Sequence, residues 1–223
     1  MSESESRGRL EGVLMEARKR SLVGGLPISQ QIAHSEAFLR AVLLEPVQGP
    51  VLELGSGGGL PGLVMAVEHP ELRLVLLDSA RRSVLFLRWA VDELELTSRV
   101  EIVHARAEQI GREEPYRESF DVVVARSFAP PAVTAECAAP LLRIGGRLIV
   151  SEPPPDNPSS GSPVLGEAPA ANRWPPAGCA ELGLTPELGL RDAFGFAVLR
   201  QTSQCPDRYP RRAGIPAKRL LFS

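Results

Sequence analysis

Three glycines at alternate positions, with an acid before them and another acid further on, are the residues best suited to chemistry in this chain. Glu53 precedes Gly55, Gly57 and Gly59, and Asp78 lies 21 residues beyond Gly57. Glycines permit the tight turn that brings bare backbone N–H groups against a ligand. A carboxylate about 20 residues further on can accept hydrogen bonds from ribose hydroxyls. The spacing predicts a binding site for a ligand that contains adenosine.

The elements that must position these residues alternate between strand and helix patterns. Such alternation favours an α/β fold with a doubly wound, mostly parallel, Rossmann-like sheet. Residues 188–201 form two short strand patterns broken near 193–195, which predicts an antiparallel hairpin at the end of the sheet. Strands are expected at 51–54, 72–77, 100–103, 121–125 and 147–150, and helices at 29–44, 61–69, 81–94 and 132–142.

The glycine turn fits two cofactor classes. Glu53 and the three alternate glycines form the E-x-G-x-G-x-G pattern of S-adenosylmethionine-dependent methyltransferases. Gly57, Gly59 and Gly62 also satisfy the G-x-G-x-x-G fingerprint of NAD(P)-dependent oxidoreductases. The turn alone does not decide between them. The rest of the chain favours a methyltransferase, because it shows the terminal hairpin typical of class I methyltransferases and lacks a Tyr-x-x-x-Lys pair.

Composition narrows the function classes further. The formal net charge of −2 is incompatible with a uniformly basic nucleic-acid binder, although a local basic patch remains compatible with it. The three cysteines form no C-x-x-C pair, so we expect neither a metal site nor a disulfide framework. The same cysteine pattern favours a reducing, cytoplasmic compartment. No apolar run reaches the ~18 residues of a membrane span, and the charged N-terminus does not resemble a signal peptide.

We expect residues 1–50 to form an N-terminal helical extension, with a polar start before its amphipathic helix, and residues 51–223 to form the methyltransferase domain. Within that domain, residues 151–176 are rich in proline and are expected to form an exposed loop. The tail at 207–223 carries five cations against one acid.

Three separated segments carry a resemblance to a known family. They are Gly55-Ser-Gly-Gly-Gly-Leu-Pro-Gly62, the stretch Leu76-Leu-Asp-Ser-Ala-Arg-Arg-Ser-Val-Leu-Phe-Leu-Arg88, and Arg208-Tyr-Pro-Arg-Arg-Ala-Gly-Ile-Pro-Ala-Lys218. In this order they resemble the RsmG (GidB) family of 16S ribosomal RNA guanine-N7 methyltransferases. The resemblance implies a class I methyltransferase fold, S-adenosyl-L-methionine as cofactor, and 16S rRNA or the small ribosomal subunit as partner.

The same resemblance implies cofactor contacts at Gly55, Leu60, Asp78, Ala107, Glu108 and Arg126. The turn itself adds Gly57 and Gly59, and Ser79, which follows Asp78, is a further candidate. Alternatives remain for three of these residues. Asp78 can bind ribose or cap the following helix through Ser79. Glu108 can accept from an adenine amino group or lie on the surface. Arg126 can meet the cofactor carboxylate or the target base, or pair with Glu136.

RNA contacts are expected at Arg211, Arg212, Lys218 and Arg219, with Arg81, Arg82 and Arg88 as further candidates. Tyr209 can stack on a base or cover the sheet edge, whereas Trp89 and Trp174 are expected to be packing residues. Guanine N7 carries a free lone pair, so no general base is required. The isolated His34, His69 and His104 are therefore assigned no catalytic role.

One segment departs from the family pattern. Family members commonly continue after the Gly-Gly turn to a Lys-Gly, where this chain reads Val150-Ser-Glu-Pro-Pro-Pro. Glu152 thereby replaces a cation. The departure keeps a second hypothesis open, a divergent member that binds S-adenosylmethionine but methylates another substrate.

Overall fold

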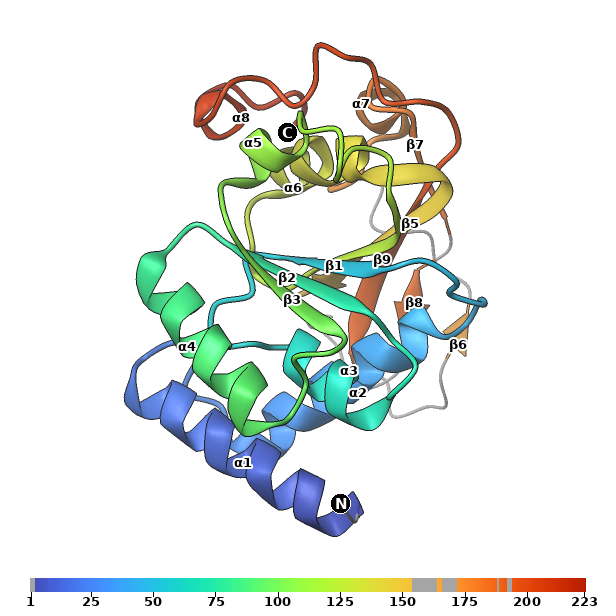
Figure 1. The fold of residues 1–223 in the computed structure, drawn as a ribbon. Helices are drawn as coiled ribbons and strands as arrows, with labels where there is room; N and C mark the ends of the chain where they lie inside the picture. The colour runs from blue at the N-terminus through green and yellow to red at the C-terminus, as the bar shows by residue number, and fades with distance from the viewer. Residues whose placement is uncertain (1–2, 154–163, 166–171, 188, 192–193) are drawn as a thin grey trace. The chain divides into compact units, whose positions relative to one another are not determined.

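The computed structural model describes residues 3–153, 164–165, 172–187, 189–191 and 194–223. The chain divides into two compact units, one ending at Ala105 and the other beginning at Arg106. Each unit combines helices with strands (Figure 1).

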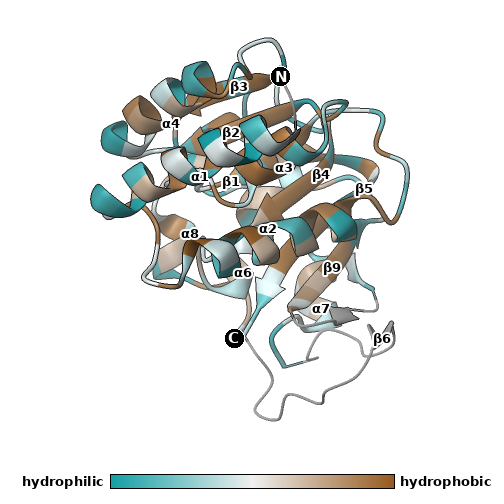
Figure 2. Cartoon of the chain, turned by 90° about the horizontal axis from the view of Figure 1, so that it is seen from below, coloured by the Kyte–Doolittle hydropathy of each residue, from teal (hydrophilic) through white to brown (hydrophobic). Residues whose placement is uncertain are grey.

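The N-terminal unit builds a parallel sheet with β2 in its centre. Strand β2 pairs with β1 on one side and with β3 on the other, and both pairings are parallel. Because parallel strands are covered on both faces, β1 and most of β2 are buried, and the apolar run of β2 is brown in Figure 2. The elements are α1 (Glu3–Lys19), α2 (Ile28–Val42), β1 (Val51–Leu54), α3 (Gly62–Glu68), β2 (Leu74–Asp78), α4 (Arg81–Glu93) and β3 (Val100–His104).

The C-terminal unit ends its sheet with antiparallel strands. Strand β5 pairs in parallel with β4 and antiparallel with β9, and β9 also pairs antiparallel with β7 and β8. The expected terminal hairpin is therefore confirmed. The elements are α5 (Ala107–Ile110), β4 (Phe120–Ala125), α6 (Pro131–Ala138), the 3-10 turn η1 (Ala139–Leu141), β5 (Leu142–Glu152), β6 (Val164–Leu165), α7 (Pro176–Ala180), β7 (Leu184–Pro186), β8 (Leu190–Arg191), β9 (Gly195–Gln201) and α8 (Ile215–Lys218).

The structure corrects several element boundaries. The polar start of the chain is the helix α1, which buries Leu10, Val13, Leu14 and Ala17 on one stripe despite its charged composition. The helix expected over 132–142 ends at Ala138, since the next residues form η1 and Leu142 already begins a strand. The short helices α5, α7 and α8 were not expected. Most of the proline-rich segment 151–176 lies outside the described residues.

Within the described ranges, the structure contains no helix with the length and apolar character needed to span a bilayer.

Candidate active site

The glycine turn follows β1 and depends on left-handed backbone. Gly55, Gly57 and Gly59 have φ angles of 67°, 51° and 84°. Side chains with a Cβ rarely adopt these values, so the alternate glycines are a geometric requirement of the turn. Leu60, which the family resemblance places at the cofactor, follows the turn directly and is buried.

A buried acid supports the start of α3 behind this turn. The Gly62 N–H donates to Glu53 Oε2 over 3.2 Å, and Glu53 is only 1% exposed. A Cβ on Gly62 would lie 2.4 Å from this oxygen, so only glycine allows the carboxylate to approach. Gly62, the third glycine of the dinucleotide fingerprint, therefore has a structural role in this fold.

Asp78 ties the end of β2 to the glycine turn. Its Oδ2 accepts a hydrogen bond from the Gly57 N–H over 2.8 Å, and its Oδ1 accepts one from the Ala80 N–H over 2.7 Å. An ionised carboxylate has about four acceptor positions, so these two bonds leave capacity for ribose hydroxyls. Ligand binding and support of the loop before α4 are thus compatible roles. Ser79, the neighbouring candidate, is exposed.

The linker between α1 and α2 lies against the same turn, which sequence reasoning missed. A Cβ on Gly58 would lie 2.5 Å from Val23 Cγ1 and 3.0 Å from the Leu22 carbonyl oxygen. The Gly24–Gly25 pair was the available signal, since adjacent glycines favour an irregular linker. The turn is thus braced from outside by the N-terminal helices' connection.

In the C-terminal unit, Ala107 and Glu108 begin α5 and are both buried. Glu108 Oε1 accepts hydrogen bonds from Arg106 Nη2 over 2.9 Å and from the Gly214 N–H over 2.8 Å. Burial acts to raise the pKa of Glu108, but these two donors, together with its own backbone N–H, outweigh burial and lower the pKa below the ordinary glutamate value. Of the two alternatives for Glu108, the surface position is wrong, because the side chain is buried and anchors the tail. Arg126, half-buried, follows β4 directly.

Glu136 on α6 forms the second anchor of the tail. The carboxylate is fully buried and accepts from the Arg211 backbone N–H, Nε and Nη2 over 2.8, 2.8 and 2.6 Å. The hydrogen bonds that Arg211 donates to this carboxylate raise the pKa of Arg211 above its ordinary value. Such a bidentate pair fixes the orientation of the guanidinium plane as well as its position. The sequence had offered Glu136 as a partner for Arg126.

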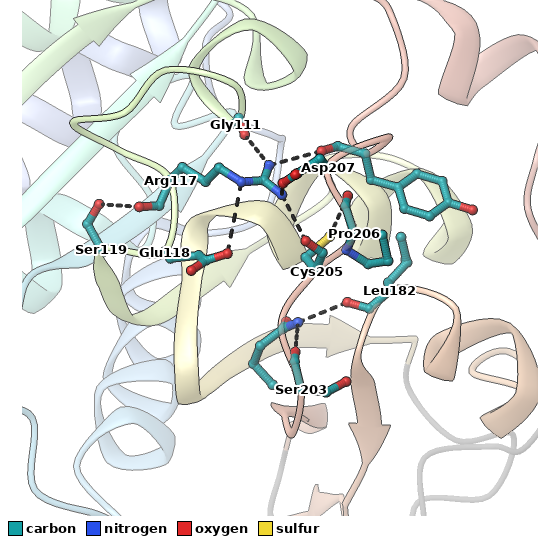
Figure 3. A network of polar contacts seen from close by, with 11 residues as sticks. Gly111, Arg117, Glu118, Ser119, Leu182, Ser203, Cys205, Pro206 and Asp207 are labelled. Carbon is teal, nitrogen blue, oxygen red and sulfur yellow. Dashed lines mark hydrogen bonds and ion pairs between the residues drawn. The ribbon is translucent and has the colours of Figure 1, made fainter.

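Arg117 forms the third anchor, shown in Figure 3. Its Nη1 donates to the Gly111 and Tyr209 carbonyl oxygens over 2.9 and 3.0 Å, and its Nη2 donates to the Cys205 carbonyl oxygen over 2.8 Å. One guanidinium thus holds the chain on both sides of Pro206. Sequence reasoning did not find Arg117, because its backbone partners leave no side-chain pattern.

The remaining tail cations point outward. Arg212, Lys218 and Arg219 are exposed, whereas Arg211 is committed to Glu136. Tyr209 is 4% exposed and its hydroxyl donates to Glu181 Oε2 over 3.3 Å, so it covers the fold and is not an open stacking platform.

Glu152, the departure from the family pattern, supports the far end of the proline-rich segment. Its Oε1 accepts from Trp174 Nε1 over 2.8 Å, and its Oε2 lies 2.9 Å from Arg173 Nε. Trp174 is 1% exposed, which confirms it as a packing residue. The glutamate at this position therefore has a structural reason.

Comparison with known structures agrees with this fold. An O-methyltransferase from Bacillus cereus in complex with SAH matches with a TM-score of 0.58 at 20% identity, over 86% of this chain and 89% of that one. Cofactor-bound Rv0187 from MTB matches with a TM-score of 0.58 at 18% identity, over 88% and 91% of the two chains. The fold is that of a class I S-adenosylmethionine-dependent methyltransferase.

Sequence comparison defines the family. The model of GidB, rRNA small subunit methyltransferase G, matches residues 30–152. A protein from Rubrobacter xylanophilus named ribosomal RNA small subunit methyltransferase G is 38% identical over 81% of this chain and 69% of its own length. A protein of the same name from Moorella thermoacetica is 34% identical over 83% and 75%. The chain belongs to the rRNA small subunit methyltransferase G family.

Proposed function

We propose that this protein transfers a methyl group from S-adenosyl-L-methionine to N7 of a guanosine in 16S ribosomal RNA. The match to the methyltransferase G family over residues 30–152 carries the proposal, because it contains the glycine turn and Asp78. Relatives at 34–38% identity carry that family's name.

The residues present suit the cofactor chemically. The turn at 55–59 offers backbone without side chains, and Asp78 offers a half-buried carboxylate that two N–H groups already orient. Adenosine needs such acceptors for its ribose hydroxyls. We assign cofactor binding to Gly55, Gly57, Gly59, Leu60, Asp78, Ser79, Ala107, Glu108 and Arg126, with Glu108 acting through its backbone because its side chain anchors Gly214.

The chain's task in the reaction is to orient its reactants and exclude water. When bound, S-adenosylmethionine supplies an electrophilic methyl group. Guanine N7 presents a lone pair and no proton, so no side chain has to remove one. Holding reactants in line can supply about 7–11 kcal/mol of barrier reduction in favourable cases. Because no proton has to be removed, the reaction needs no catalytic histidine.

Exposed tail cations are the proposed RNA contacts. Arg212, Lys218 and Arg219 are free to approach phosphates, while Glu108, Glu136 and Arg117 hold the loop that carries them. Arg211 contributes by shaping that loop. Phosphate contacts of this kind position an RNA and weaken with salt.

Two measurements test the proposal. Calorimetric titration compares S-adenosylmethionine, S-adenosylhomocysteine and NAD, and we expect the first two to bind and NAD not to bind. Unmodified small-subunit rRNA is then incubated with protein and methyl-labelled cofactor, and we expect one labelled guanosine whose glycosidic bond is labile after reduction, as N7 methylation requires. Cofactor binding without RNA labelling would favour the divergent member with another substrate, and binding of NAD alone would overturn the proposal.

A further inference from the structure

The end of α1 meets the outer side of α4 through a cation–aromatic contact. The Arg20 guanidinium carbon lies 5.5 Å from the ring centre of Trp89 and 5.8 Å from that of Phe86. Glu16 accepts from Arg20 Nε over 2.8 Å and keeps the guanidinium in place. Because its guanidinium lies over the indole ring, Arg20 covers one side of Trp89. Arg20 itself is exposed to solvent.

A second contact fixes the first turn of α4. Arg82 Nη2 donates to the Ser21 carbonyl oxygen over 3.1 Å. Through these two contacts the end of α1 and the outer side of α4 form one continuous surface. Residues of this connection, Leu22 and Val23, also brace the glycine turn.

The outer face of α4 carries cations and exposed apolar groups side by side. Arg81, Leu85, Arg88 and Trp89 follow helical spacing, and all are exposed, with Leu85 at 54% and Trp89 at 37%. The opposite face, which includes Val84 and Leu87, is buried. The expectation that Trp89 only packs is thus incomplete.

These charges are available to a partner. In the described part of the chain, no ion pair engages Arg81 or Arg88. The acids of this helix, Asp92 and Glu93, lie at its far end. The first two turns of α4 therefore offer uncompensated positive charge beside an exposed indole. Arginine next to an accessible aromatic ring suits phosphates and unstacked bases together, whereas a protein partner would need a larger apolar patch.

We propose that this α1/α4 surface, formed by Arg20, Arg81, Arg82, Leu85, Arg88 and Trp89, binds a single-stranded RNA segment next to the methylated guanosine. The inference rests on the proposed function and adds a second RNA contact to the tail. Helix α4 begins three residues after Asp78, so the surface starts beside the residue assigned to the cofactor's ribose. RNA held there would therefore lie beside the residue that would hold the cofactor.

The test compares single variants of full-length protein. Arg81→Gln and Arg88→Gln each remove one proposed phosphate contact, and Arg73→Gln is the matched control, because Arg73 is also exposed but precedes β2 where Arg81 follows it. Binding of an unmodified small-subunit rRNA transcript is measured by fluorescence anisotropy at several salt concentrations. We expect each α4 variant to bind several-fold more weakly and to reduce the slope of log affinity against log salt by about 0.7, the single-strand value per contact.

A third variant separates stacking from charge. Trp89→Leu is expected to weaken RNA binding several-fold without changing the salt slope, and none of the variants is expected to alter S-adenosylmethionine affinity. If the wild-type protein methylates the transcript but both arginine variants behave like Arg73→Gln, the inference is overturned and the proposed function stands. A wild-type protein that neither binds nor methylates the RNA overturns both.

Discussion

The glycine turn and the C-terminal tail both match family motifs, but they are held in opposite ways. Hydrogen bonds that support the turn join Gly62 to Glu53 and Gly57 to Asp78, residues 9 and 21 positions apart. Those that hold the tail span 75, 92 and 106 positions. The hydrogen bonds of the turn therefore join segments close in sequence, whereas the tail takes its shape from distant anchors in the C-terminal unit.

This difference predicts separable failures. Damage to the tail anchors Glu136 and Arg117, neither of which is assigned to the cofactor, should cost stability and RNA methylation while leaving cofactor affinity intact. Damage around the turn should act on cofactor binding first, since its supports lie within the N-terminal unit.

Arg211→Ala is expected to cause the largest loss of stability. It leaves the fully buried Glu136 carboxylate without its charged partner, and breaking such a pair costs about 3–5 kcal/mol. Urea denaturation followed by circular dichroism measures the change. The matched control is Arg212→Ala, an exposed neighbour expected to change stability by less than about 0.5 kcal/mol. Equal losses of stability from the two substitutions would show that the Arg211–Glu136 pair does not stabilise the fold.

Asp78→Asn is expected to weaken cofactor binding next most strongly. The amide keeps the shape but loses the charge that strengthens hydrogen bonds to ribose and to the Gly57 N–H, a loss of about 1.5–3 kcal/mol. Calorimetry with S-adenosylhomocysteine measures it. RNA affinity measured without cofactor should stay unchanged, because the amide keeps its acceptor for the Ala80 N–H before α4. A parallel loss of RNA binding would mean that the charge of Asp78 is also needed to shape the start of α4.

Gly58→Ala is expected to destabilise the N-terminal unit by about 1–3 kcal/mol, the usual cost of overpacking. The new Cβ would overlap Val23 Cγ1 and press on the Leu22 carbonyl oxygen. Adding Val23→Ala removes the first overlap and should recover part of the stability in a double-mutant cycle. Strictly additive effects of the two substitutions would mean that the linker does not brace the turn.

The sequence predicts the features that depend on short runs of neighbouring residues. The strands, the glycine turn and Asp78 follow from runs of a few residues, and the terminal hairpin follows from turn spacing. The helix α1 was missed because its charged residues hide a narrow apolar stripe at Leu10, Val13 and Leu14.

The tail could be recognised from its sequence, but its construction could not be derived from it. Arg117 binds backbone carbonyl oxygens, which have no residue identity to read. Arg211 was expected to be an RNA contact because it is a cation in a basic tail. Only the fold shows that Glu136 binds its side chain and leaves Arg212 exposed.

The smallest expected effect is a pH-dependent release of the tail from Glu108. The pKa of Glu108 is lowered despite its burial because Arg106 and the Gly214 N–H stabilise the carboxylate. A lowered folded-state pKa means that this stabilisation is complete above the ordinary glutamate value of about 4.3 and is lost as pH falls through the lowered folded-state pKa. The Gly214 amide shift, followed by NMR between pH 7 and 3, should therefore titrate with a midpoint below that value.

Glu108→Gln supplies the control for this titration. The neutral amide can still accept from Gly214, but it carries no charge to titrate, so the pH dependence of the Gly214 amide should flatten while the loop stays in place. A midpoint at or above the ordinary glutamate value would mean that burial outweighs the two donors. In that case Glu108 would lose its role as an anchor, and the tail would depend on Glu136 and Arg117 for its shape.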